Sequence, residues 1–111
     1  MTALPAGWKL KDPDHAVRIC RALVEQGEDL ARNNPIPKKE FHYLIALVEG
    51  AKAVLTCYKD AWDTNKHGEP GPDDATIAYW RGRREQADLT VKDSAQTYAP
   101  RMAEAGMEVP E

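Results

Sequence analysis

The amino-acid sequence predicts an all-α fold: a three-helix up-down-up bundle dominated by a long antiparallel helical hairpin. Apolar residues recur at spacings of three and four in three separate stretches, which is typical of helices that pack against one another. Proline, aspartate and glycine occur at the ends of these stretches, where helices start and stop. With 111 residues, 42% of them hydrophobic, the chain has the size and composition of one globular domain.

The same signals divide the chain into three parts. We expect residues 1–11 to form an N-terminal leader, residues 12–99 a single helical domain, and residues 100–111 a flexible acidic tail. A tail that docks on the bundle or on a partner is the alternative. Within the domain, helices are expected at about 12–33, 37–67 and 72–99.

The first helix is expected to begin at Asp12-Pro13-Asp14. Asp12 can accept hydrogen bonds from the unpaired N–H groups of the first turn, and Pro13 suits the first helical position. Gly27 lies within the apolar face, at a cost of about 1 kcal/mol relative to alanine. This cost suggests that Gly27 allows a close approach to another helix, and the small residues of the second helix are its natural partner.

The second helix, from Pro37 to about His67, carries apolar residues on two faces, so we expect it to lie at the centre of the bundle. The first face contains Phe41, Leu44, Val48, Ala51, Leu55, Tyr58 and Trp62. The second is a line of small residues, which contains Ala46, Gly50, Ala53, Cys57 and Ala61. Cys20 and Cys57 both lie on apolar faces, which favours two buried free thiols, although a disulfide between packed helices stays possible.

The third helix is expected to begin at Pro72-Asp73-Asp74 and to stop before Pro100. Its apolar seam follows a heptad spacing and contains Ile77, Trp80, Arg84, Ala87, Val91, Ser94 and Tyr98. Laid antiparallel on the second helix, this seam places Ile77 opposite Trp62 and Arg84 opposite Leu55. The register therefore predicts a buried Trp62.

Arg84 is a charged residue within an apolar seam and needs a partner or an exit. Its stem can be buried while its head reaches past Leu55 to solvent. It can also meet an acidic group from the first helix or from another subunit, or line a polar pocket for an anionic ligand. The sequence leaves all three interpretations open.

Aromatic residues and arginines occur together in the segment Tyr79–Arg84. Such residues can stack on a base and bind phosphate, which makes Trp80, Arg81 and Arg84 a candidate ligand site. A simpler interpretation is ion pairing along the helix surface, because Arg81 and Arg84 each have an acidic residue four positions later. Arg83 has no such acid.

Composition and motifs exclude several functional classes. The net charge of −3 argues against a general nucleic-acid binder, and no apolar run is long enough to span a membrane. The N-terminus has no secretory signal pattern, so we expect a cytoplasmic protein. The three histidines lack metal-ligand spacing, and no nucleophile motif or glycine-rich phosphate loop occurs. We therefore expect no metal, no cofactor and no enzymatic activity.

The leader contains the sequence LPAGWKL, residues 4–10. These seven residues resemble the opening of small phage and prophage accessory proteins, and the resemblance stops at Lys11. It implies a genomic origin rather than a mechanism. Within this segment, Trp8 has two interpretations: a cap on the end of the bundle, or a contact residue for a partner.

Together these features predict a non-catalytic helical factor that binds another protein. The candidate contact residues are Trp8, Tyr43, Tyr79 and Arg83. The second helix has more apolar surface than two modest helices cover, so self-association as a homodimer is expected. The phage resemblance implies a host protein as the partner that is inhibited or modulated. The alternative is a binder of a small molecule or a nucleotide, cyclic nucleotides included, with its pocket between helices or subunits.

Overall fold

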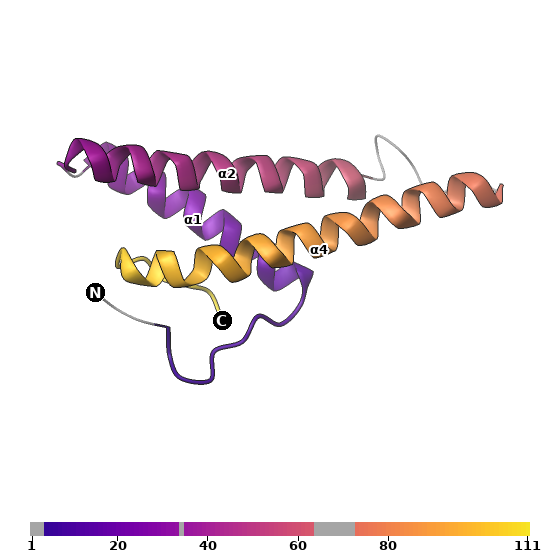
Figure 1. The fold of residues 1–111 in the computed structure, drawn as a ribbon, viewed down its shortest axis with the longest axis horizontal. Coiled ribbons are helices and arrows are strands. Elements are labelled where there is room, and N and C mark those ends of the chain that lie inside the picture. Colours follow the sequence, from indigo (N-terminus) through magenta and orange to yellow (C-terminus); the bar gives the residue numbers. More distant parts are fainter. Residues whose placement is uncertain (1–3, 34, 64–72) are drawn as a thin grey trace.

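A computed structural model of the chain describes residues 4–33, 35–63 and 73–111. In this part of the chain the regular structure consists of three α-helices: α1 (Pro13–Asn33), α2 (Lys38–Trp62) and α4 (Asp74–Glu104). Figure 1 shows α1 and α4 running in one direction and α2 in the other. The predicted all-α three-helix fold is confirmed. The molecule is elongated and flat, with principal extents of 54 × 31 × 18 Å.

The predicted helix starts are present. Asp12 accepts a hydrogen bond from the His15 N–H at 2.8 Å, and Pro13 is the first residue of α1. At the start of α4, Asp73 accepts from the Thr76 N–H at 2.8 Å, and this bond lowers the pKa of the Asp73 carboxyl. The start of α2 comes one residue later than predicted, after Pro37. The predicted end of that helix at 64–67 and the turn up to residue 72 lie outside the described residues.

The prediction that Pro100 stops the third helix is wrong. Pro100 lies inside α4, which continues to Glu104. Proline lacks an N–H and so removes one helical hydrogen bond, at a cost of about 3 kcal/mol. The residues that follow offset this cost, because Met102 is fully buried and Ala103 is 5% exposed. Burial of the last turn therefore carries the helix past the proline.

The prediction of a flexible acidic tail also needs correction. Gly106 has a φ of +82°, and its N–H donates to the Ala103 carbonyl at 3.1 Å. The Met107 N–H donates to the Met102 carbonyl at 2.9 Å, which completes the paired hydrogen bonds of a Schellman turn. This turn sends the chain back onto the bundle, and Met107 joins the hydrophobic core. Residues 107–111 are therefore a docked segment.

The core is centred on α1, not on α2 as predicted. Seven residues of α1 are buried, of which Ile19, Cys20 and Leu23 are completely inaccessible. The buried residues of α2 are Leu44, Val48, Ala51 and Ala61. The small-residue line of α2 is only partly covered: Ala61 is buried and Gly50 lies against the Tyr98 hydroxyl of α4, whereas Ala46, Ala53 and Cys57 are exposed. Cys57 is accordingly exposed, whereas burial raises the pKa of Cys20 to about 11.

Gly27 does mark a close approach of two helices, but its partner differs from the prediction. A Cβ atom at Gly27 would lie 2.4 Å from a methyl carbon of Val48 and 3.5 Å from one of Leu44. Both residues belong to the large-residue face of α2. The glycine therefore admits branched side chains from α2, and the small-residue line is not involved.

The predicted register of the hairpin is wrong by about six residues. Arg84 lies opposite Ala61, to whose carbonyl its Nε donates at 3.0 Å, and not opposite Leu55. Six residues correspond to about 9 Å along a helix. The buried face of α4 continues through Ala95, Ala99 and Met102, and so extends beyond Pro100, where the sequence predicts the end of the helix. Burying those residues slides α4 along α2, and Trp62 stays 42% exposed.

Candidate functional site

Two adjoining stripes of α2 and α4 form an exposed surface, which we call the α2–α4 outer face. At 100° per residue, the α2 stripe lies about 140–180° from the core-facing Val48, and the α4 stripe about 80–140° from the core-facing Val91. Tyr43–Arg101 and Asp60–Arg83 contacts join the two helices along it. The α2 stripe consists of Tyr43, Ala46, Gly50, Ala53 and Cys57. The α4 stripe consists of Tyr79, Arg83, Gln86, Thr90, Thr97 and Arg101.

One end of the α2–α4 outer face carries Tyr43 and Arg101. The Tyr43 ring is 52% exposed, and its hydroxyl accepts a hydrogen bond from Arg101. The guanidinium carbon also lies 5.8 Å from the ring centroid, within the range of a cation–π contact. These two contacts hold a large exposed aromatic ring in one orientation.

The other end carries Tyr79, Trp80 and Arg83. The Tyr79 ring is 55% exposed and packs edge-on against Trp80, with centroids 5.2 Å apart. The Arg83 guanidinium lies 5.9 Å from the Tyr79 ring and 5.8 Å from the Trp80 ring, and it donates to the Tyr79 hydroxyl at 3.3 Å. Its Nη2 also pairs with Asp60 of α2 at 3.7 Å. Arg83 has no acidic residue four positions later on α4, and it pairs instead with Asp60 on the other helix of the hairpin.

In the structure Arg84 binds a main-chain carbonyl of α2, a partner that none of the three interpretations named. Its side chain is 8% exposed, and it donates to the carbonyl of Ala61, in the last turn of α2. Carbonyls at a helix C-terminus lack helical partners, and a cation also complements the helix dipole there. The guanidinium lies 5.0 Å from the centroid of Trp62. Arg84 therefore holds the end of α2 in place.

The predicted contact residue Trp8 belongs to the fold. Its ring packs on His15 with centroids 6.0 Å apart, and it is partly buried against the hydrophobic core with Leu4 and Leu10. Its Nε1 is buried without a hydrogen-bond partner among the described residues. The cap interpretation fits this placement, and Trp8 is not an exposed contact residue. Tyr43, Tyr79 and Arg83 remain as the candidates that share one face.

The alternative ligand site is only partly assembled. Arg81 and Arg84 line a depression of about 340 Å³ together with Trp62 and Ile77. Trp80 lies instead against Tyr79 and Arg83. The base-stacking aromatic and the two arginines therefore do not surround one cavity.

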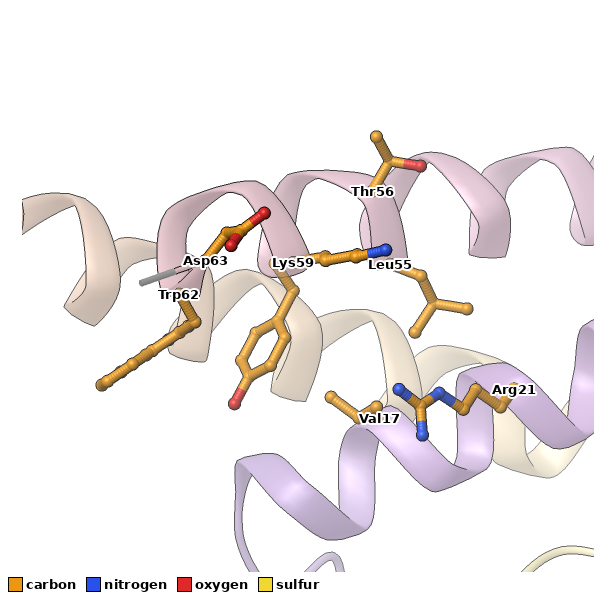
Figure 2. Close-up of a pocket in the computed structure, with 8 residues that line it drawn as sticks. Val17, Arg21, Leu55, Thr56, Lys59, Trp62 and Asp63 are labelled. Atoms are coloured by element: carbon orange, nitrogen blue, oxygen red, sulfur yellow. The ribbon is translucent and has the colours of Figure 1, made fainter. Parts of the chain in front are cut away.

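A larger depression of about 490 Å³ lies between α1 and α2 near the hairpin end. Figure 2 shows Val17 of α1 and Leu55 of α2 facing each other across it, with Arg21 and Lys59 among the polar residues around them. Desolvation, followed by the charge of Asp88, raises the pKa of Tyr58, which also lines this depression. The depression combines apolar side chains with two cations, Arg21 and Lys59, and one carboxylate, Asp63.

In residues 4–33, 35–63 and 73–111, no group of three or more His, Cys, Asp or Glu side chains is placed to hold a metal ion. None of the helices in these ranges is long and apolar enough to cross a membrane. Comparisons with protein-family models, with curated proteins and with solved structures found no match.

Proposed function

We propose that this protein is a non-catalytic interaction factor that binds a helix of another protein on the α2–α4 outer face. The observation that carries the proposal is the pair of exposed tyrosines, each fixed by an arginine, at the two ends of that face. Tyrosine and arginine are enriched in protein interfaces and supply much of their binding energy. Because Tyr43 and Tyr79 are already oriented, binding loses little side-chain entropy.

The middle of the α2–α4 outer face supports a helical partner. Ala46, Ala53 and Cys57 are exposed and small, so a partner backbone can approach α2 closely there. Arg101 and Tyr79 are 22 positions apart on α4, which corresponds to about 33 Å. A partner helix of about 20 residues reaches both tyrosine–arginine pairs.

Charge favours a different protein over a second copy at this face. In a two-fold antiparallel pair, the Arg83 end of one copy would meet the Arg101 end of the other, which brings cations together. A partner helix with acidic residues near both ends avoids this repulsion. In line with the phage resemblance of the leader, we propose a cytoplasmic host protein as that partner. Self-association, expected from the sequence, stays a prediction.

The test uses three purified proteins as bait in a bacterial cell extract: the wild type, a Tyr43→Ala/Tyr79→Ala variant, and a Leu89→Ala control. Leu89 is 56% exposed and lies outside this face, about 60–120° around α4 from its residues. We expect at least one protein to be retained by the wild type and the control, and at least tenfold less by the double variant. Equal retention by all three baits would contradict the proposal.

Light scattering shows whether the α2–α4 outer face binds a second copy of this chain or a different protein. At micromolar concentration, the Tyr43→Ala/Tyr79→Ala variant is expected to keep the oligomeric state of the wild-type chain. If the wild-type chain is a dimer that the Tyr43→Ala/Tyr79→Ala substitutions dissociate, the face belongs to a second copy and the proposed host partner is wrong.

A small-molecule binder is the second candidate, and one cavity favours it. The groove between the C-terminal half of α1, the start of α2 and the end of α4 has a volume of about 420 Å³. Leu23, Leu44 and Met102 contribute apolar walls, with Tyr43 and Arg101 beside them. Such a lining suits an apolar ligand better than a nucleotide. A thermal-shift screen of apolar acids and nucleotides tests this candidate, since a ligand specific for the folded state raises Tm.

A further inference from the structure

The chain after α4 is held to α1 by contacts to its backbone. The Gln26 side chain makes two hydrogen bonds to one residue: its Oε1 accepts from the Glu108 N–H at 2.8 Å, and its Nε2 donates to the Glu108 carbonyl at 2.8 Å. An amide side chain that satisfies both groups of one residue replaces the neighbouring strand that an extended peptide would have in a sheet.

Two further side chains of α1 continue this pattern. The His15 ring is completely buried, and its Nε2 lies 2.7 Å from the Pro110 carbonyl. Because Nδ1 accepts from the Lys11 N–H at 3.0 Å, the proton sits on Nε2, which donates to that carbonyl. Arg18 donates to the Glu111 carbonyl oxygen at 3.2 Å. Three α1 side chains thus bind main-chain groups of residues 108, 110 and 111.

The side chains of the docked segment alternate as in an extended peptide. Met107 is 7% exposed and Val109 is partly buried, and both pack against the hydrophobic core. Glu108 and Glu111 are exposed. Pro110 has no N–H, so its position requires only the carbonyl that His15 binds. Recognition therefore depends on main-chain groups and on two apolar side chains spaced two residues apart.

We infer that α1 carries a peptide-binding groove, formed around His15, Arg18 and Gln26, which residues 107–111 occupy in the free protein. The groove accepts an extended segment of a partner protein with the same chemistry: an apolar residue, any residue, a second apolar residue, then proline. Backbone recognition leaves most of the sequence of such a segment unrestricted. The groove is on α1 and is independent of the proposed α2–α4 outer face.

The docked segment competes with any partner peptide for the groove. It is joined to α4 through Ala105 and Gly106 alone, so its effective concentration at the groove is in the millimolar range. A free peptide therefore competes poorly unless the docked segment is removed or displaced. This predicts a groove that is closed in the free chain and open after release of residues 107–111.

The test measures binding of a synthetic peptide with the sequence Gly-Met-Glu-Val-Pro-Glu, residues 106–111, by fluorescence anisotropy. For a chain that ends at Gly106 we expect a Kd of about 10–1000 µM, and at least tenfold weaker binding to the full chain. A Gln26→Ala substitution in the shortened chain should weaken binding at least fivefold. A peptide carrying serine in place of Met107 and Val109 is the matched control and should not bind.

Three results would overturn the inference: no binding to a folded shortened chain at millimolar peptide, equal binding of the serine control, or equal affinity of the full and shortened chains. If the shortened chain does not fold, a full-length Met107→Ser/Val109→Ser variant takes its place in the same titration.

The wild-type chain gives a further readout that needs no variant. The Glu108 amide, bonded to Gln26, should be protected from hydrogen exchange, and millimolar peptide should reduce this protection. A Glu108 amide that exchanges as fast as in the free peptide would show that the groove is not occupied, and would contradict the inference.

Discussion

The three-helix part of the molecule and its hairpin end are stabilised in different ways. In the three-helix part, α1, the middle of α2, α4 from Val91 onward and the docked segment enclose completely buried aliphatic side chains such as Ile19 and Leu23. The hairpin end comprises residues 60–62 of α2 and 74–85 of α4. Its buried residues include Arg84, and its aromatic rings are largely exposed.

This difference follows from the number of elements that meet in each region. Where three helices and a docked segment converge, apolar side chains lose all contact with water, and each contributes about 1.5–3 kcal/mol. Where two helices run side by side, few positions are enclosed: at the hairpin end the buried residues are Ala61 and Arg84. There the chain uses long arginine stems, cation–π contacts and a guanidinium bonded to a helix carbonyl. The hairpin end should therefore be the less stable region.

The largest effect is expected in the three-helix part. Leu23→Ala removes a side chain that is completely buried, so the free energy of unfolding should fall by about 2–5 kcal/mol. Urea denaturation measures this change. Leu89→Ala, at a position that is 56% exposed, is the control and should change it by less than about 0.5 kcal/mol. Similar losses for both variants would mean that Leu23 is not in a packed core.

At the hairpin end the corresponding position is Arg84. Arg84→Met keeps the apolar stem but removes the donor to the Ala61 carbonyl, which should cost about 1–3 kcal/mol. Arg81→Met is the control on the same helix, since Arg81 is exposed, and it should leave the denaturation midpoint nearly unchanged. A tolerated Arg84→Met substitution would show that the carbonyl contact does not stabilise the end of α2.

Replacing one glycine in each region with alanine should change the stability of the protein in opposite directions. In Gly27→Ala the new Cβ would lie 2.4 Å from Val48, and the resulting repacking should destabilise the protein by about 1–2 kcal/mol. Gly82 has no atom within 4 Å of an added Cβ, so Gly82→Ala should stabilise α4 by up to about 1 kcal/mol. The Tm of each variant relative to the wild type measures the direction of both changes. A gain in Tm for Gly27→Ala would contradict the close approach of α1 and α2.

The smallest effect concerns pH. Burial raises the pKa of Cys20 from 9.0 to about 11, so the unfolded chain loses this proton at a lower pH than the folded one. The contribution is fully present below pH 9 and is lost as pH rises to about 11. At pH 10 the loss should be about 1 kcal/mol. Urea denaturation at pH 8 and pH 10 should show this loss in the wild type but not in Cys20→Ala. An equal change in the free energy of unfolding between the two pH values for both proteins would contradict a buried thiol.

Local signals in the sequence predicted local structure well. Asp12 and Asp73 accept hydrogen bonds from first-turn N–H groups, as their positions before a helix predict. The buried middle of α2 was also identified, because three- and four-residue spacing reports which side chains share a face. Tyr43, Tyr79 and Arg83 were singled out as exposed contact residues, and the structure brings them to one face.

Features that depend on tertiary packing were not predicted. Pro100 carries a local stop signal, and only the burial of Met102 explains why the helix continues. The signal for the docked segment was present in Gly106 followed by an apolar residue, the pattern of a Schellman turn. Docking of the tail was only the alternative to a flexible tail, because the helix was assumed to end before Gly106. The hairpin register then failed for the same reason, since residues 100–104, about one and a half turns of α4, were left out of the alignment.

Native-state hydrogen exchange, resolved by residue, tests the contrast between the two regions most directly. We predict that the amides of Leu23 and Val91 exchange only through global unfolding, and that Glu108 is protected together with them or nearly so. Amides of residues 79–83 should open at a distinctly lower free energy. If residues 79–83 were as protected as Val91, or if Glu108 exchanged as in a free peptide, the description of a packed three-helix part with a docked segment and a weaker hairpin end would be contradicted.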